Sequence, residues 1–232
     1  MANPLKGLLR RDPPKDLVLG PYVILEVTDP VDHCDVLRHR YGVYASEGHI
    51  QPEAAPTGEF RDVFDSVAVQ LLARDEEGVA VGSSRIVLPS GLGLPTQRLF
   101  NLGPLLIDPS KLGEVGRLCV SRTHRGGSRT VLVGLIAQIY NGLRARGLTH
   151  FLAFMRPELV RGLRAIRVPI RPLSHAEPGP EALEARRAMA GYFSCGDVLA
   201  TLCSLDEMDQ RIESGARAPF DSRLPSVRPT TV

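Results

Sequence analysis

One segment near the middle of the chain constrains the fold more than any other. Residues 131–147 read VLVGLIAQIYNGLRARG, and their apolar side chains recur at helical spacing. The residues that share one broad hydrophobic face are Val131, Leu132, Leu135, Ile136, Ile139 and Leu143. A helix with such a face has to pack on other structure. Apolar runs at 114–121 and 149–155 flank it and are typical of strands, so we predict a strand–helix–strand unit whose helix covers a sheet.

Further strands and helices are expected on both sides of this unit. Two apolar runs at 66–74 and 79–88, separated by the turn sequence DEEG, indicate a hairpin. The other expected strands are 22–27, 168–173 and 197–204, and the other expected helices are 31–44, 157–166, 178–192 and 205–213. A long loop is expected at 46–60 and irregular structure at 89–112. This order predicts an α/β (α+β) fold in which antiparallel hairpins and one crossover share a mixed sheet.

Length and composition predict one domain with a full core. The chain has 232 residues, of which 43% are hydrophobic and 23% charged, as in ordinary globular proteins. Residues 1–20 contain two adjacent prolines, and we expect them to form a flexible arm. Residues 21–215 are expected to form the single domain. Residues 216–232 are polar and contain three prolines, so they are expected to be a frayed tail.

Several classes of protein do not fit the sequence. The net charge of +2 gives no general electrostatic case for nucleic-acid binding. No run approaches the roughly 18 apolar residues of a membrane span, and the N-terminus lacks the apolar run of a signal peptide, so the cytoplasm is the expected compartment. The cysteines form no pair at zinc-site spacing, and the common dinucleotide and P-loop motifs do not occur, so no metal is expected.

The turn before the central helix predicts an anion site. Gly126 and Gly127 allow close approach of the backbone, and Ser128 is a plausible N-cap for the helix. The first amides of a helix have no partner inside it, and the helix dipole attracts negative charge there. The basic residues that flank the turn are Arg122, Arg125 and Arg129. A pyrophosphate or phosphopantetheine phosphate would suit this site, but a plain strand-to-helix turn explains the same residues.

A second set of polar residues lies at the entrances and in the interiors of predicted strands. Asp62 and Asp65 stand just before one strand, and Arg85 interrupts an apolar one. A buried arginine needs a carboxylate partner. Glu114 and Arg117 are three apart on another strand and therefore point to opposite faces unless a bulge intervenes. A structural ion-pair network or exposed strand faces would account for the same pattern.

In order and spacing, this set resembles the acyl-homoserine-lactone synthases. The matching pieces are Arg40, Asp62-x-x-Asp65, Arg85 and Glu114-x-x-Arg117. The segments YGVY, VGSSRIVLP, GEVGRLCVSRTHR and GLTHFLAFMRPEL look still more like N-acyl amino acid synthases and exosortase-associated acyltransferases. The resemblance covers about residues 20–175. It implies the GNAT (acyl-CoA N-acyltransferase) fold, a mixed twisted sheet flanked by helices.

The sequence departs from these families at three points. Homoserine-lactone synthases carry a Glu two residues before the first Asp, where this chain has Phe60. Tryptophan, usual in the N-terminal region of those enzymes, is absent. The glycine turn does not match the GNAT signature in its spacing. The first two departures favour an amino acid or similar amine over homoserine lactone chemistry.

The resemblance implies direct transfer of an acyl group, expected to be a fatty acyl group, from a thioester to a small amine. Acyl-CoA or the phosphopantetheine of an acyl carrier protein would be the co-substrate, with no tightly bound cofactor. Glu114 is then the first candidate for the proton-accepting carboxylate and Asp65 the second. Arg85 and Arg117 would hold an acceptor carboxylate or order the acidic motif, to which Asp62 and Arg40 also belong.

The thioester donor would bind beside the strand that carries Glu114. Backbone N–H groups from Leu118 to Val120 would polarise the carbonyl, and the phosphate would lie at the glycine turn. An apolar channel for the acyl chain has four candidate residues, all of which also suit a plain core: Leu148, Phe151, Leu152 and Phe154. Two alternatives remain open, an inactive GNAT-fold module that binds thioesters and an unrelated α/β interaction protein.

Overall fold

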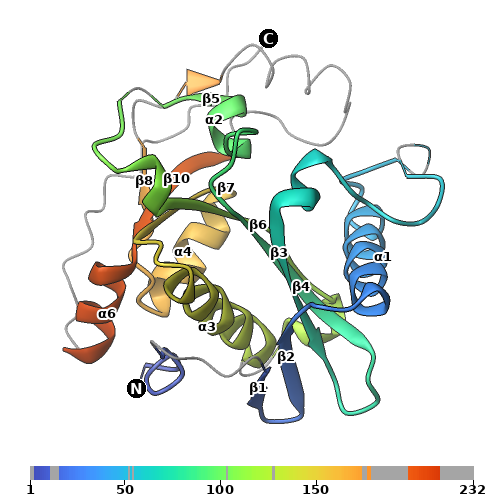
Figure 1. The fold of residues 1–232 in the computed structure, drawn as a ribbon. Coiled ribbons are helices and arrows are strands. Elements are labelled where there is room, and N and C mark those ends of the chain that lie inside the picture. The colour runs from blue at the N-terminus through green and yellow to red at the C-terminus, as the bar shows by residue number, and fades with distance from the viewer. Residues whose placement is uncertain are drawn as a thin grey trace, which may run out of the picture.

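The protein is built on an eight-stranded twisted sheet with helices on both faces (Figure 1). The computed structural model describes residues 3–10, 16–51, 53, 55–102, 104–126, 129–173, 177–178 and 198–214. The strands of the sheet, in their spatial order, are β1 (Asp16–Leu19), β2 (Tyr22–Glu26), β3 (Ala68–Arg74), β4 (Ala80–Val87), β6 (Leu112–Val120), β7 (His150–Met155), β10 (Leu199–Ser204) and β8 (Arg171–Pro172). β6 and β7 are parallel, and the other neighbours pair antiparallel.

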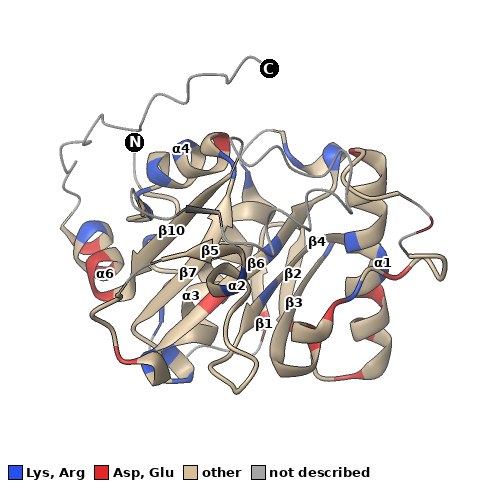
Figure 2. Cartoon of the chain, turned by 90° about the horizontal axis from the view of Figure 1, so that it is seen from above, with Lys and Arg blue, Asp and Glu red and all other residues tan. Residues whose placement is uncertain are grey.

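Smaller elements surround this sheet. A second sheet pairs β5 (Phe100–Asn101) with β9 (Glu177–Pro178). The helices are α1 (Pro30–Ser46), α2 (Pro95–Leu99), α3 (Thr130–Ala145), α4 (Pro157–Ala165) and α6 (Leu205–Glu213), and the 3-10 turns are η2 (Val63–Val67), η3 (Pro109–Lys111) and η4 (Arg122–His124). Acidic and basic residues are interspersed over α1, α4 and α6 rather than gathered by sign (Figure 2).

The alternation of side chains along β4 separates the two layers of helices. Ser83 and Arg85 face α1, where the Nδ1 atom of His39 lies 2.9 Å from the Ser83 hydroxyl. The neighbouring positions face α3, and a Cβ atom added to Gly82 would lie 2.6 Å from a methyl group of Val131. Because successive side chains of a strand point to opposite faces, the sheet has one polar layer under α1 and one apolar layer under α3.

Two irregularities in β6 position the candidate site. β7 pairs with β6 over only three positions, Leu112–His150 to Glu114–Leu152, after which the two parallel strands separate. On the other edge, the register between β4 and β6 shifts between Ser83 and Arg85. This one-residue bulge contains Arg117, whose φ of 55° lies in the left-handed region. A bulge re-aims a side chain, and Arg117 consequently reaches the α1 face of the sheet.

Most of the predicted elements are confirmed, and four expectations about local structure need correction. The hairpin, the central helix, its flanking strands and the late strand and helix all form. The segment 89–112, expected to be irregular, contains α2, β5 and η3, whereas the loop 46–60 ends, as expected, before the 3-10 turn η2. Of the expected strand 168–173 only β8 pairs, and Pro178 belongs to β9 rather than to a helix; residues 179–192 lie outside the described part of the chain. α3 is capped by Arg129, and Ser128 is not described.

The expectation of a flexible arm over residues 1–20 is wrong for the part that the structure describes. Asp16–Leu19 pairs with β2 as the outermost strand, with Leu17 opposite Ile24. Leu5 is fully buried in the core beneath α3. Asn141 of α3 anchors this segment by accepting a hydrogen bond of 2.9 Å from the Arg10 N–H. The tandem prolines, which suggested a loose chain, lie outside the described residues, and the described residues on either side of them pack against the sheet and α3. The remaining domain boundaries stay predictions.

The close approach of α3 to β2 gives a first test of this packing. A Cβ atom at Gly134 would lie 2.6 and 2.9 Å from two side-chain carbons of Ile24. We expect Gly134→Val to lower the free energy of unfolding by about 1–3 kcal/mol because it overpacks the layer. Gly162 of α4 has open space around its Cβ position, so Gly162→Val is the matched control. Urea unfolding of both variants measures the difference, and equal stabilities would contradict this account of the α3 packing.

Candidate active site

Three arginines and two aspartates form a closed network under α1. Arg85 donates from Nη1 to Asp62 at 2.6 Å and to Asp65 at 2.8 Å, and from Nη2 to Asp62 at 2.9 Å. Arg40 donates to both carboxylate oxygens of Asp65 at 3.0 and 3.1 Å. Arg117 donates to Asp62 at 2.7 Å. Every charge in the network therefore touches an opposite one, as burial requires.

The two aspartates are also tied to their own backbone. They occupy the first and last positions of a capping box in η2, in which Asp62 accepts from the Phe64 N–H and Asp65 from the Asp62 N–H. Gln70 of β3 donates to Asp65 at 2.9 Å and accepts from Arg40 at 2.9 Å. The D-x-x-D spacing thus fits one 3-10 turn whose carboxylates point inward.

Both aspartates are held in the charged form. Burial opposes ionisation of Asp62, but the hydrogen bonds and charges of Arg85 and Arg117 outweigh it and keep its pKa well below the ordinary value. Burial likewise opposes ionisation of Asp65, and the charges of Arg40 and Arg85 lower its pKa. A carboxylate stabilised in this way is a weak base. The geometry therefore favours a structural role for Asp65 and leaves Glu114 as the better candidate base.

Glu114 differs from the aspartates in almost every respect. It is 1% exposed and lies at the last paired position before β6 and β7 separate. Its Oε2 accepts a 2.7 Å hydrogen bond from the backbone N–H of Thr96 in α2. Burial raises the pKa of Glu114 to about 8, against the opposing influence of this hydrogen bond and of the charges of Arg85 and Arg117. A carboxylate with a pKa near neutrality suits general acid–base chemistry.

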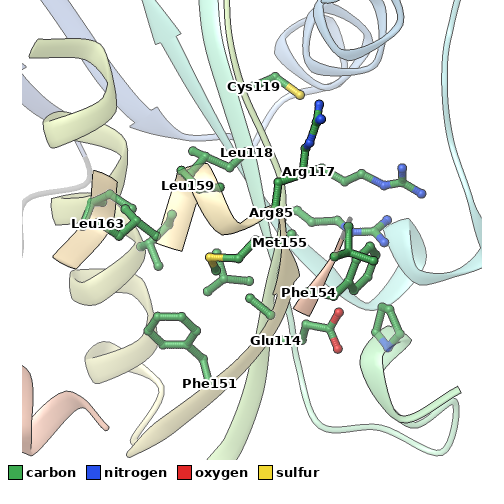
Figure 3. A pocket seen from close by; sticks show the side chains of 18 of the residues that line it. Arg85, Glu114, Arg117, Leu118, Cys119, Phe151, Phe154, Met155, Leu159 and Leu163 are labelled. Carbon is green, nitrogen blue, oxygen red and sulfur yellow. The ribbon is translucent and has the colours of Figure 1, made fainter. Parts of the chain in front are cut away.

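A cavity of about 210 Å³ begins at Glu114 and extends to both sides of the separated strands. On one side it is lined by Tyr44, Arg85 and Arg117, and Figure 3 shows the two arginines on the same side of the strand as the Glu114 carboxylate. The opposite side is apolar, and its lining comes from α3, β7, α4 and α6: Ile136, Ile139, Tyr140, Phe151, Met155, Leu159, Leu163 and Met208. The cavity therefore joins a charged chamber to a hydrophobic one.

The apolar residues singled out from the sequence divide between cavity and core. Phe151 and Phe154 line the cavity, whereas Leu148 and Leu152 are buried in the two hydrophobic clusters. Cys119 also lines the cavity, but burial raises the pKa of its thiol to about 11, which disfavours the nucleophilic thiolate.

A second hollow of about 350 Å³ lies at the N-terminus of α3. Its lining includes the side chains of His124, Arg125 and Arg129. Arg125 also donates from Nε to the Val120 carbonyl at 2.7 Å and forms an ion pair with Glu47.

Two of the other residues predicted for the donor site line this hollow. Leu118 and Val120 of β6 line it, whereas Arg122 and Gly126 are exposed and are not among its lining residues. Gly127 and Ser128 lie outside the described residues.

Four contributors to the site were missed from the sequence. Thr96 holds Glu114, Gln70 bridges Arg40 and Asp65, and the rings of Phe60 and Tyr44 lie 4.7 and 5.7 Å from the Arg117 guanidinium carbon. Phe60 therefore packs on an arginine of the network, and its carbonyl accepts a hydrogen bond from Arg40. The one signal for Thr96 was Pro95 before it, which is typical of a helix start.

Comparison with known proteins assigns the fold. LasI, an AHL synthase, superimposes with a TM-score of 0.62 at 13% identity, covering 85% of this chain and 97% of LasI. TofI, solved with an inhibitor and MTA, gives 0.57 at 19% identity, covering 81% and 96%. FeeM, an N-acyl amino acid synthase from uncultured soil microbes, gives 0.55 at 13% identity, covering 82% and 93%. These likenesses confirm the predicted GNAT-like acyltransferase fold. No curated protein matches the sequence.

The family model "N-acyl amino acid synthase FeeM" matches residues 35–168, more than half of the chain. The chain belongs to the FeeM family. This confirms the prediction of an N-acyltransferase made from the sequence. The matched range begins within α1 and ends after α4, so it contains Arg40, both aspartates, Arg85, Glu114 and Arg117.

The described part of the FeeM-like chain has no group of three or more His, Cys, Asp or Glu residues that could hold a metal ion. Its helices include none with the length and hydropathy needed to cross a membrane.

The buried pair of Arg40 and Asp65 supports a prediction about stability. The Arg40 side chain is 1% and the Asp65 side chain 8% exposed. We expect Asp65→Asn to cost about 3–5 kcal/mol of unfolding free energy, because it leaves the buried Arg40 without a counter-charge. Asp206→Asn is the control, since that side chain is 66% exposed where it pairs with Arg144 and its loss should cost under about 1 kcal/mol. Similar costs for the two variants would show that the network is not a stabilising unit.

The raised pKa of Glu114 predicts an unusual dependence of stability on pH. Between the ordinary pKa of a glutamate, 4.5, and the raised pKa of about 8, the folded protein keeps a proton that the unfolded chain releases. Stability should therefore fall with rising pH in this window, by up to about 1.4 kcal/mol per unit. Glu114→Gln removes this contribution, so its stability relative to the wild type should increase from pH 5 to pH 8. Denaturation midpoints at several pH values measure it, with the exposed Glu76→Gln as control; parallel curves for Glu114→Gln and the wild type would contradict the prediction.

Proposed function

We propose that this protein transfers an acyl group from a pantetheine thioester to the amine of an amino acid or similar small acceptor. The observation that carries the proposal is the position of Glu114, a buried carboxyl group at the point where β6 and β7 separate and the cavity opens. The proposed catalytic group is Glu114, and Arg40, Asp62, Asp65, Arg85 and Arg117 form the network that shapes the chamber beside it.

The separation of the parallel strands supports a site for the donor. β7 leaves the edge of β6 after Glu114, so the backbone from Leu118 to Val120 has no β7 partner in the sheet register. Backbone groups on such an edge suit the amide-rich pantetheine arm and the thioester carbonyl. The hollow at the start of α3, with Arg125 and Arg129, suits the phosphate at the far end of that arm. Arg122 and Gly126 stand on either side of Arg125 in the sequence, and their predicted contributions remain part of this proposal, as do those of Gly127 and Ser128.

The apolar half of the cavity supports a fatty acyl group. Its walls come from four separate elements and present mainly aliphatic and aromatic side chains. A hydrocarbon chain that leaves the thioester near Glu114 would pass between β6 and β7 into this half. The donor would be acyl-CoA or an acyl carrier protein; both are co-substrates that leave as thiols rather than tightly bound cofactors. The cytoplasm, where such thioesters are made, is the proposed location.

The charge of the network supports an acceptor that bears a carboxylate. Three arginines and two aspartates leave one net positive charge, and Arg117, with 18% of its side chain exposed, brings that charge to the cavity. An amino acid would place its carboxylate towards Arg117 and its amine towards Glu114 and the thioester. This acceptor class agrees with the interpretation drawn from Phe60 and from the absence of tryptophan.

The proposed reaction balances with Glu114 as the proton acceptor. The acceptor enters as an ammonium ion and gives one proton to the Glu114 carboxylate, directly or through water. The free amine attacks the thioester carbonyl, the C–N bond forms and the C–S bond breaks. The amine nitrogen of the tetrahedral intermediate loses a second proton, and the departing sulfur takes up one. One amide, one thiol and one released proton result for each acyl group transferred.

An assay of thiol release tests the proposal. Long-chain acyl-CoA and acyl carrier protein are offered as donors against a panel of amino acids, and product N-acyl amino acids are identified by mass spectrometry. We expect Glu114→Gln to lower kcat/KM by about 10²–10⁴-fold, the usual contribution of a general base, with donor affinity retained. Donor binding without turnover by the wild type would instead favour the inactive binding module, and neither binding nor turnover would overturn the proposal.

A further inference from the structure

The first turn of α2 donates a hydrogen bond to Glu114 in addition to packing against it. α2 begins at Pro95, which has no N–H, so Thr96 is the first residue of this turn able to donate from its backbone. That N–H points at Glu114 Oε2 with a 2.7 Å hydrogen bond between two buried residues. Pro95 and Glu114 both line the cavity. The first turn of α2 is therefore part of the wall on which the candidate base lies.

The side chain of Thr96 is the second observation. Thr96 is fully buried, and its hydroxyl Oγ1 makes no hydrogen bond of good geometry. The hydroxyl nevertheless lies close enough to Glu114 to lower the pKa of that carboxyl group. A buried hydroxyl without a partner is costly and needs an explanation. Valine would fill the same volume without that cost. The presence of a hydroxyl therefore suggests that it donates a hydrogen bond in another protonation state of the site.

The charged groups near Glu114 do not explain the Thr96 hydroxyl, because their hydrogen bonds go elsewhere. Arg85 from β4 and Arg117 from β6 act on Glu114 through their charges, but both donate to the aspartates of η2. On the side of β7 the neighbour in register is the apolar Leu152. Among the described groups, α2 therefore provides the direct hydrogen bond to the Glu114 carboxyl group.

We propose that Thr96 is a positioning residue for Glu114. Thr96 determines which oxygen of Glu114 carries the proton, and it stabilises the carboxylate once that forms. This inference rests on the proposed function of Glu114 as the base. Oε2 accepts the Thr96 N–H and cannot at the same time point a proton towards it, so the neutral acid carries its proton on Oε1. When that proton leaves, a small rotation brings the Thr96 hydroxyl within donating distance of the new negative charge.

Because the neutral acid carries its proton on Oε1, the proton has one defined path through the site. The acceptor ammonium gives its proton to Oε1 of the carboxylate, and the Thr96 hydroxyl then loses its charged acceptor while the backbone N–H stays bonded to Oε2. After the product leaves, Oε1 returns the proton to solvent and the hydroxyl bond forms again. No other reactant is needed, because only a proton moves.

The kinetic test compares Thr96→Val with Thr96→Ser over pH 6 to 9.5. Valine keeps the shape and the backbone N–H but removes the donor to the carboxylate, so the neutral acid is favoured. The rising limb of the kcat/KM profile should therefore move to higher pH by about 0.5–1 unit. At pH 7 this shift lowers kcat/KM by about 3–10-fold, and at the alkaline plateau the variant recovers to within about twofold. Thr96→Ser should restore the wild-type profile. The ionisation of the acceptor amine is common to all variants and cancels in the comparison.

A nuclear magnetic resonance titration tests the contact without turnover. The Thr96 amide proton of the full chain should shift as Glu114 ionises and follow a single titration, and Glu114→Gln should abolish that shift. Exposed Thr57→Val is the control for both experiments and should leave the profile and the amide titration unchanged.

Each outcome bears on a different claim. If the Thr96 amide titrates but the protein transfers no acyl group, the contact between Thr96 and Glu114 is supported and the proposed function is rejected. A flat Thr96 amide, or an unmoved limb in a folded and active Thr96→Val, overturns the role of Thr96. If Thr96→Val fails to fold, the amide titration of the wild type decides alone.

Discussion

The architecture of this site depends on the cost of burying Arg40. A guanidinium group with no exposed surface is tolerated only when carboxylates surround it, and Asp65 meets it with both oxygens. Asp65 in turn needs Arg85 and the capping box of η2, and Asp62 needs Arg85 and Arg117. One buried charge thereby links α1, η2, β4 and β6 into a single polar layer. Loss of Asp65 would leave the buried Arg40 without the carboxylate that meets it, so the stability of α1 depends on residues of the other three elements.

This rigid polar layer allows the neighbouring carboxyl group to behave differently. Because the arginines are already paired with aspartates, their charge only partly offsets the burial of Glu114, and the pKa of Glu114 rises to about 8. The aspartates and the glutamate are the same functional group, yet one environment keeps the charge and the other removes it. Such divergence between adjacent carboxyl groups is what separates structural acids from candidate catalytic ones.

Backbone irregularities decide which residues can share the site. In a regular strand Glu114 and Arg117 would face opposite layers, and the left-handed conformation of Arg117 is what brings its guanidinium to Asp62. The hydrophobic periodicity of the chain predicted β6 but gave no sign of the bulge, since bulges depend on the pairing with β4. Thr96 was missed for a similar reason: it lies 18 residues from Glu114 in a segment without periodicity, and only packing brings them together.

The sequence by itself determined the class of fold, the amphipathic α3 helix and the acidic and basic residues of the network, because these depend on local periodicity and on motifs of fixed spacing. It also predicted that a buried Arg85 would need a carboxylate partner, which follows from the cost of an unpaired charge. The tertiary structure decided the rest. Long-range pairing incorporated Asp16–Leu19 into the sheet and separated β7 from β6 beyond Glu114. Packing placed the two aspartates among the arginines and Glu114 in the cavity lining. Those outcomes depend on which groups are buried against one another. Residues that are distant in the sequence determine this burial, so local sequence patterns do not reveal it.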